Sequence, residues 1–246
     1  GAGRVDTLAR DASDAAARAR AGEVSARVSR VAEDAADRLA ERRREAVATE
    51  AHKGLLDAVR AAGNDLGFYP TPPTLAVYAV SLAGIRPGDR VLEPSAGTGS
   101  LVDALVAEGA RVTALELQGD RAAYLRAAWA PRGVNVRAGD FLAYMAENLA
   151  DDGGPFDAVV MNPPFSVGGR RYTDVDHVRH ALRLVRPGGR VVAIMAPTTP
   201  TRDDAKTRSF REEIRAWRPT WEPVEPKRFR LSGTDVPTVL LTLTRP

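Results

Sequence analysis

Residues 91–100 read VLEPSAGTGS, and this stretch decides the fold class of the chain. A short apolar run ends in a turn that holds Gly97 and Gly99. Glycine lets a backbone come close to a ligand because no Cβ stands in the way, and the helix expected from Ser100 presents free N–H groups at its start. The pattern predicts a strand, a ligand-binding turn and a helix, in that order.

Strands and helices alternate on both sides of this turn. Alternation of this kind predicts an α/β fold with a mostly parallel sheet that helices cover on both faces. Near the C-terminus, a run at 227–231, a turn at 232–235 and a β-rich run at 236–244 predict an antiparallel hairpin at the sheet edge. The other expected strands are 90–93, 111–115, 134–137, 157–161 and 190–195.

The N-terminal part has a different composition. Residues 4–62 contain no proline and are rich in Ala, Arg and Glu, which favour helix. We expect a helical extension over 1–62, ahead of a domain that spans 63–246. Its thin apolar stripe, which includes Val24, Val28 and Leu39, predicts docking on the main domain, binding of a protein partner or self-association.

Four polar residues each fall just past the end of a predicted strand: Glu93, Glu116, Asp140 and Asn162. In an open parallel sheet, ligands bind at the carboxyl ends of the strands, near the point where the strand order reverses. We therefore expect these four side chains to line one site.

The residue types at this edge indicate the kind of ligand. Gly97-Thr98-Gly99 is not followed by the third glycine of a dinucleotide fold, and carboxylates would repel a pyrophosphate. They suit a cationic cofactor that carries a sulfonium and an ammonium group. In such a site Glu116 can accept hydrogen bonds from ribose hydroxyls, and Glu93 can pair with a positively charged group. Asp140 can accept a hydrogen bond from an adenine amine, and Phe141 can pack on the adenine ring.

The motif Asn162-Pro163-Pro164-Phe165 indicates the chemistry. An adenine amino group is a poor nucleophile because its lone pair is delocalised into the ring. The side-chain carbonyl of Asn162 and the backbone carbonyl of Pro163 can each accept one N–H, which favours a pyramidal nitrogen. The two prolines restrict the backbone, so the carbonyls stay directed at the amine. Phe165 can stack on a base that has left its helix.

Three segments together resemble a known family: LEPSAGTGS at 92–100, FYPTP at 68–72 and NPPF at 162–165. They are similar to class I S-adenosylmethionine-dependent methyltransferases, specifically the N6-adenine DNA methyltransferase type. The resemblance implies a Rossmann-like, seven-stranded sheet, S-adenosylmethionine as cofactor, and an Asn-Pro-Pro-Phe motif that holds the target base. It implies cofactor contacts from Tyr69, Thr71, Glu93, Ser95, Gly97, Glu116 and Asp140, with Gly99 in the same turn.

The substrate stays open at this stage. Residues 165–230 hold 15 Lys or Arg against eight Asp or Glu, which suits a polyanion such as DNA, read through the loops 166–173 and 197–208. The same motif also serves enzymes that methylate base amines in RNA or glutamine amides in proteins. A free nucleotide is a further candidate acceptor, and a non-enzymatic, partner-binding module on the same fold is a second alternative.

Composition excludes several other classes. The chain has no cysteine and three histidines, so we expect no metal site and no disulfide framework. No window approaches the roughly 18 apolar residues of a membrane span, and the N-terminus lacks the apolar core of a secretory signal. These features predict a cytoplasmic protein.

Overall fold

The computed structural model describes residues 71–167, 169–224 and 237–246. The predicted helical extension over 1–62, Tyr69 and the run at 227–231 lie outside these residues.

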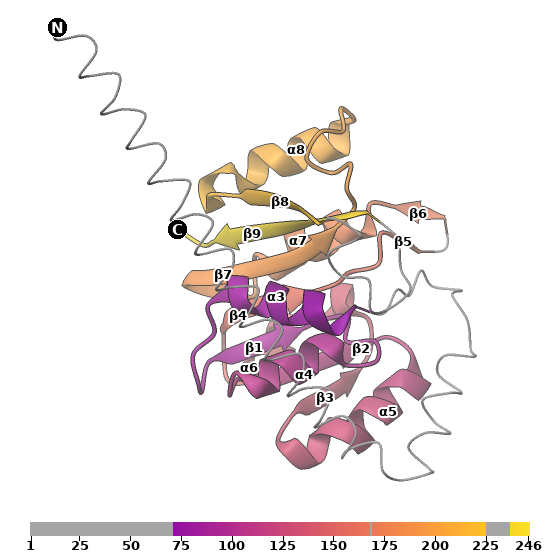
Figure 1. The fold of residues 1–246 in the computed structure, drawn as a ribbon, viewed down its shortest axis with the longest axis vertical. Coiled ribbons are helices and arrows are strands. Elements are labelled where there is room, and N and C mark those ends of the chain that lie inside the picture. Colours follow the sequence, from indigo (N-terminus) through magenta and orange to yellow (C-terminus); the bar gives the residue numbers. More distant parts are fainter. Residues whose placement is uncertain (1–70, 168, 225–236) are drawn as a thin grey trace, which may run out of the picture.

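A seven-stranded sheet forms the centre of the domain, with the strand order β3-β2-β1-β4-β7-β9-β8 (Figure 1). The first five run parallel, and β9 runs antiparallel to both of its neighbours. The order reverses beside β1, where β2 lies on one side and β4 on the other. The strands are β1 (Arg90–Glu93), β2 (Arg111–Glu116), β3 (Asn135–Ala138), β4 (Phe156–Met161), β7 (Val185–Met195), β8 (Thr220–Val224) and β9 (Thr238–Thr244).

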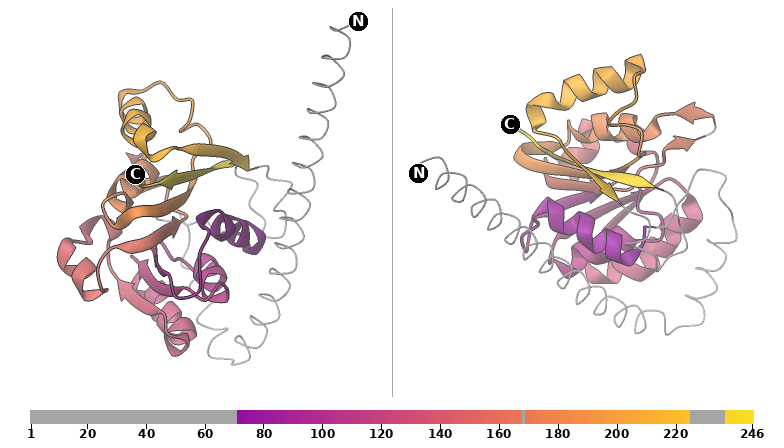
Figure 2. Two further views of the ribbon diagram at one scale, coloured as in Figure 1. Left: turned by 90° about the vertical axis from the view of Figure 1, so that its left-hand side faces the viewer. Right: turned by 45° about the horizontal axis from the view of Figure 1, so that its top comes forward.

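Helices cover both faces of this sheet (Figure 2). One face carries α3 (Pro73–Ala83), α4 (Ser100–Ala107) and α5 (Gly119–Trp129), whose apolar residues form one core cluster with the strands. The other carries α7 (Thr173–Ala181) and α8 (Ala205–Glu213), which form a second cluster. Shorter elements are α6 (Ala146–Asp151), the 3-10 helices η1 (Ala130–Arg132), η2 (Phe141–Ala143) and η3 (Ile214–Trp217), and the hairpin of β5 (Ser166–Val167) and β6 (Arg170–Arg171).

The two clusters share the same central strands because successive residues of a strand point to opposite faces. Val91 lies in the first cluster and Leu92 in the second. Likewise, Val160 lies in the first and Val159 in the second. The strands predicted at 90–93, 111–115, 134–137 and 157–161 are confirmed within one residue at each end.

Three local predictions need correction. The strand that pairs with β9 is β8 (Thr220–Val224), which the sequence did not predict. Strand β7 begins at Val185 rather than 190, because the ladder continues beyond an irregularity that pairs Phe156 with Val185 and Ala158 with Arg190. The predicted loop 166–173 contains the hairpin of β5 and β6. Within the described ranges, no helix is long and apolar enough to cross a bilayer.

Candidate active site

The predicted site residues end neighbouring strands at the carboxyl edge of the sheet. Glu93 is the last residue of β1 and Glu116 the last of β2, and Asn162 directly follows β4. Asp140 follows β3 after one glycine. The structure therefore brings these four residues to one edge, beside the reversal of strand order.

The glycine turn is tied to β2 by two hydrogen bonds. The Gly97 N–H donates to Oε2 of Glu116 at 2.8 Å, and the Ala96 N–H donates to the carbonyl of Leu115 at 2.9 Å. Both glycines have positive φ, 55° for Gly97 and 84° for Gly99, which explains why glycine is favoured there.

Gly99 also has a packing role. A Cβ on this residue would lie 2.7 Å from Cη2 of Trp129 and 3.0 Å from Cδ2 of Leu125. The missing side chain thus lets α5 pack against the turn. A contact between Gly99 and the cofactor stays a prediction.

Glu93 is a fully buried carboxylate at the base of the turn. Its Oε1 accepts from the Ser95 N–H at 3.0 Å, whereas Oε2 has no hydrogen-bond partner among the described residues. Burial raises the pKa of Glu93 well above its ordinary value; the Ser95 N–H opposes this shift, and the nearby charge of Glu116 adds to it. A buried acceptor without a donor fits a positively charged or N–H-bearing ligand, as the cofactor prediction requires.

Glu116 already accepts three donors. Its Oε1 accepts hydrogen bonds from the Gln118 N–H at 2.8 Å and from Nε of Arg121 at 3.0 Å. Its Oε2 accepts one from the Gly97 N–H. A carboxylate offers about four acceptor positions, so one position remains for a ligand. Glu116 can therefore accept one ribose hydroxyl, and acceptance from both would require Arg121 to move. Arg121 is not predictable as a site residue from the sequence, because its position in α5 has the pattern of an ordinary helix surface residue.

Asp140 and Phe141 differ in their placement. Asp140 is exposed, and its Oδ1 accepts from the Leu142 N–H at 2.9 Å, which caps η2. Phe141 is only 2% exposed, with its ring centroid 4.8 Å from His180 and 5.3 Å from His177. The structure places Phe141 in the core and does not support its predicted packing on adenine. Leu117, which directly follows Glu116, is an apolar side chain that is 53% exposed.

Asn162 is anchored by a residue from a distant segment. Its Nδ2 donates to Oγ1 of Thr71 at 3.0 Å. Thr71 therefore does not cap α3, whose N-cap residue is Pro72 and lacks a side-chain cap. After Asn162, Pro163 is buried, while Pro164 and Phe165 are partly exposed. The Phe165 carbonyl accepts the Thr173 N–H at 3.2 Å, which holds the end of the motif against α7.

The two histidines of α7 have structural partners. His180 Nε2 lies 2.9 Å from the carbonyl of Tyr144, and its Nδ1 lies 2.9 Å from Nη2 of Arg183. His177 Nδ1 lies 2.8 Å from the carbonyl of Thr173. Burial lowers the pKa of both rings, so both are neutral near pH 7. In His180 the neutral ring donates to Tyr144 and accepts from Arg183.

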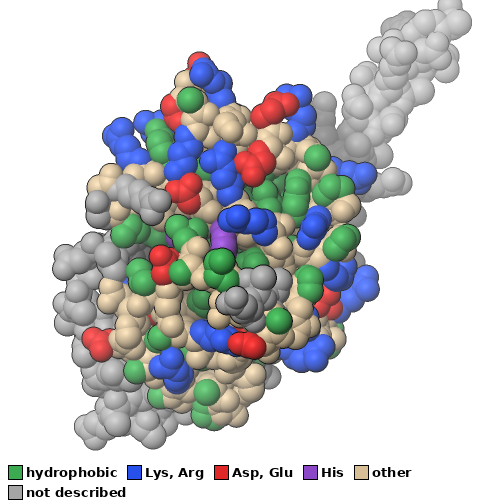
Figure 3. Space-filling model, turned by 180° about the vertical axis from the view of Figure 1, so that it is seen from behind, with side chains coloured by type: hydrophobic (Ala, Val, Ile, Leu, Met, Phe, Trp, Pro, Cys, Tyr) green, Lys and Arg blue, Asp and Glu red, His purple; other side chains and the backbone are tan. Residues whose placement is uncertain are grey.

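Several basic side chains in residues 165–230 are paired with carboxylates. Figure 3 shows Lys and Arg side chains with Asp and Glu among them on the face seen from behind. Several cations on α7, α8, η3 and the loop between β7 and α8 pair with carboxylates at 2.7–3.1 Å: Arg179 with Glu213, Arg202 with Asp204, Lys206 with Asp176, Arg208 with Asp203, and Arg215 with Glu212.

Comparisons with known proteins agree with this geometry. Residues 91–189 match the family model described as a methyltransferase domain. The chain is 33% identical over 113 residues to the ribosomal RNA small subunit methyltransferase C of Chromohalobacter salexigens, over 44% of this chain and 31% of that protein. It is 33% identical over 128 residues to the protein-L-isoaspartate O-methyltransferase of Methylorubrum populi, over 51% of this chain and 53% of that protein. The chain thus spans about a third and about half of the length of these relatives.

A solved structure gives the same picture of the fold. A putative class I S-adenosylmethionine-dependent methyltransferase from Listeria monocytogenes matches with a TM-score of 0.60 at 13% identity, over 79% of this chain and 67% of that one. Residues 91–189 therefore match a methyltransferase domain, and the strand order with its glycine turn is the fold of a class I S-adenosylmethionine-dependent methyltransferase. S-adenosylmethionine is its cofactor, and the chemistry it supplies is an activated methyl group on a sulfonium.

Proposed function

We propose that this protein transfers a methyl group from S-adenosylmethionine to an exocyclic amine of a nucleic-acid base, with N6 of adenine in DNA as the first candidate. The observation that carries the proposal is the position of Asn162. It follows β4 directly, at the same sheet edge as Glu93, and its amide is held by Thr71.

One group of residues at this edge is expected to bind the methyl donor, and another group is expected to bind the methyl acceptor. Glu93, Ser95, Gly97 and Glu116 are expected to hold the cofactor, and Oε2 of Glu93, which has no hydrogen-bond partner among the described residues, is expected to accept a hydrogen bond from it. Because Nδ2 of Asn162 faces Thr71, Oδ1 is directed away from Thr71 and is suited to accept one N–H of the target amine. The Pro163 carbonyl can accept the other.

With both N–H bonds held, the nitrogen lone pair is no longer delocalised into the ring. The amine nitrogen, held by Asn162 and the Pro163 carbonyl, would then be able to accept the methyl group that the cofactor supplies, and it would lose one proton to solvent. The catalytic contribution of the chain is therefore positioning and electrostatic stabilisation. Phe165, which is partly exposed, is expected to stack on the extruded base.

RNA is the second candidate acceptor. It is favoured by the identity to a ribosomal RNA methyltransferase, in a match that covers 44% of this chain. The chemistry at Asn162 would be the same for both polymers.

The test is methyl transfer from labelled cofactor to four acceptors offered separately: mixed-sequence DNA, total RNA, free nucleosides and a glutamine-containing peptide. Asn162→Ala should lower transfer by about 10²–10³-fold, because an acceptor aimed at the reacting group is lost. Its affinity for S-adenosylmethionine, measured by calorimetry, should stay within about threefold of wild type.

Asn135→Ala is the matched control. Asn135 also donates from its side-chain amide, to Asp152 at 2.7 Å, but it begins β3 at the amino edge of the sheet. This variant should keep full transfer. Label incorporation by the peptide alone would move the proposal to a protein acceptor, and loss of cofactor binding in Asn162→Ala would contradict the role assigned to Asn162.

A further inference from the structure

The first turn of α7 contacts three segments that come from different parts of the chain. The Thr173 N–H donates to the carbonyl of Phe165, which ends the Asn-Pro-Pro-Phe motif. The carboxylate of Asp174 accepts the Ala196 N–H, just beyond β7, at 3.1 Å. Asp176 accepts from Nζ of Lys206, in α8, at 2.8 Å. A single helical turn thus joins the catalytic motif, the loop after β7 and α8.

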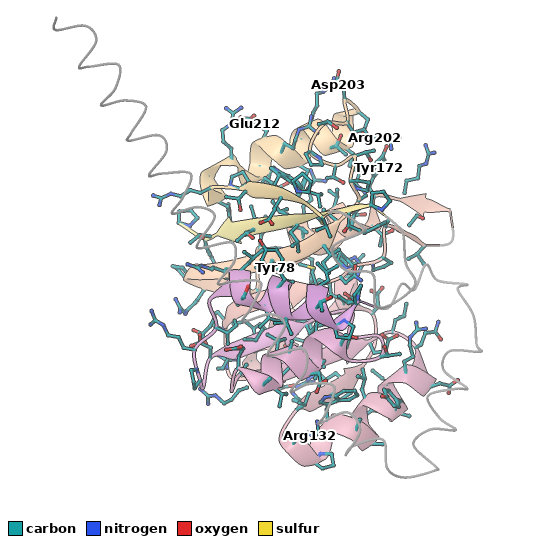
Figure 4. The ribbon with its side chains drawn as sticks, viewed as in Figure 1. Tyr78, Arg132, Tyr172, Arg202, Asp203 and Glu212 are labelled. Carbon is teal, nitrogen blue, oxygen red and sulfur yellow. The ribbon has the colours of Figure 1, made fainter. Side chains whose placement is uncertain are left out.

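The residue before this turn strengthens the same junction. Tyr172 has a φ of 63°, a left-handed conformation that is uncommon for an aromatic residue and costs energy. Its ring lies 5.0 Å from the guanidinium of Arg202 and 5.7 Å from Nζ of Lys206. Figure 4 shows Tyr172 and Arg202 close together where the chain enters α8. The surroundings therefore hold Tyr172 in a strained conformation at the junction.

Asp174 lies at the centre of this arrangement, and burying its carboxylate costs free energy. Its side chain is 1% exposed. Oδ1 accepts a hydrogen bond from the Val175 N–H at 3.0 Å, and Oδ2 accepts one from the Ala196 N–H. Burial raises the pKa of its carboxyl, and the two N–H donors only partly oppose that shift. Asp174 is not the N-cap of α7, which is Tyr172, so capping of the helix does not explain why a carboxylate is buried here. The long-range bond to Ala196 is what the second oxygen adds.

The sheet register places Ala196 at the same edge of the sheet as the Asn-Pro-Pro-Phe motif. Met161, the last residue of β4, pairs with Ala193 of the neighbouring strand β7, which continues for two residues to Met195 before Ala196. Any shift of the loop after β7 would change the space next to the motif.

We propose that Asp174 is a positioning residue for the acceptor: by binding the Ala196 N–H, it holds the loop 196–202 at a fixed place beside Asn162-Pro163-Pro164-Phe165, so that the two form opposite sides of one acceptor slot. This inference rests on the proposed function. It adds a residue that does not touch substrate but acts through the backbone of Ala196.

The experiment compares Asp174→Ala and Asp174→Asn with Asp157→Ala. Asp157 is a matched control because its carboxylate also bridges two elements, accepting the Arg90 N–H at 2.8 Å and Nε of Arg186 at 2.6 Å, but at the amino edge of the sheet. Asp174→Ala should lower kcat/KM for the nucleic acid by about 10–100-fold, since small misplacements are costly in positioning catalysis. Cofactor affinity by calorimetry should change by less than about threefold.

Asp174→Asn keeps one acceptor oxygen and should recover part of the loss, and it serves as the readout if the alanine variant does not fold. Asp157→Ala should lose stability while keeping kcat/KM. Equal kcat/KM in wild type and both folded Asp174 variants would overturn the proposal, since a purely structural role would change only stability.

Failure of the proposed function is distinguishable from failure of this inference. If the wild type methylates no nucleic acid, the proposed function is wrong, and hydrogen exchange still tests Asp174 in the ligand-free protein. Amides of residues 196–204 should exchange faster in Asp174→Ala than in Asp157→Ala, relative to those of β1. Unchanged exchange there would contradict the inference on its own.

Discussion

Asn162 Nδ2 and Thr71 Oγ1 lie 3.0 Å apart and join two residues that are 91 positions apart in the sequence. An amide has one donor end and one acceptor end, so a partner at Nδ2 determines where Oδ1 points. Thr71 is buried and leads into α3, a helix packed on the face of the sheet that carries α4. The orientation of the acceptor oxygen is therefore set by a residue outside the motif.

Thr71→Val should lower kcat by about tenfold with little change in fold. Valine has nearly the same shape as threonine but cannot accept the hydrogen bond, and a lost hydrogen bond of about 1.4 kcal/mol, near the upper end of the usual range, corresponds to roughly a tenfold effect on rate. Steady-state transfer to the acceptor identified for the wild type would measure it.

Thr71→Ser is the control for this prediction. Serine keeps the hydroxyl, so its kcat should stay within about twofold of wild type. A valine variant with wild-type kcat would show that the orientation of Asn162 does not depend on Thr71.

Glu93→Gln should stabilise the ligand-free protein above neutral pH and weaken its binding of S-adenosylmethionine. The folded-state pKa of Glu93 is raised above its unfolded value, because the carboxyl is fully buried. The folded state therefore holds the proton more tightly, and stability is lost as pH rises from the unfolded pKa through the folded pKa. Glutamine stays neutral in both states and removes this loss.

Urea denaturation at about pH 5 and about pH 8 would measure the change. The free energy of unfolding should fall less with rising pH in the variant than in wild type. Cofactor affinity should drop by about tenfold, the size expected for a lost charge-assisted hydrogen bond. A variant with an unchanged pH dependence would mean that Glu93 does not carry the buried charge.

Gly99→Ala should destabilise the protein by about 2–5 kcal/mol. The substitution combines a strained positive φ with a clash against Trp129, whose Cη2 would lie 2.7 Å from the new methyl group. Gly133→Ala is a matched control, because Gly133 has the same φ of 84° but no atom within 4 Å of the added Cβ. It should cost only the strain, about 1–2 kcal/mol. Equal losses in urea denaturation would contradict a packing role for Gly99.

The strands of the sheet and the positions of Glu93, Glu116 and Asn162 were predictable from local pattern. Each strand is a short apolar run bounded by turn residues, and parallel strands carry the residues that follow them to one edge. Strand β8 was missed because Pro223 lies within it, and proline argues against a strand except at a sheet edge, where β8 lies.

The partners within the site were not predictable in the same way. Phe141 beside Asp140 looks like a ligand contact, but its neighbours His177 and His180 come from α7, which is distant in sequence. Thr71 before two prolines has the pattern of a helix cap, yet its hydroxyl binds Asn162. The charge of Arg121 meets Glu116 only when α5 packs on the sheet. Such pairings join segments that are distant in the sequence, so a local pattern of residues does not predict them.

The two core clusters are built on opposite faces of the same strands: Val91 and Val160 belong to one, and Leu92 and Val159 to the other. Neither layer of helices can separate without disturbing strands that the other layer also needs. The domain should therefore melt cooperatively, as one unit. A small molecule bound beside the glycine turn would then raise the melting temperature of α7 and α8 as much as that of α4 and α5. A thermal-shift screen of candidate ligands would thus report binding through a single transition, wherever the fluorescent probe sits.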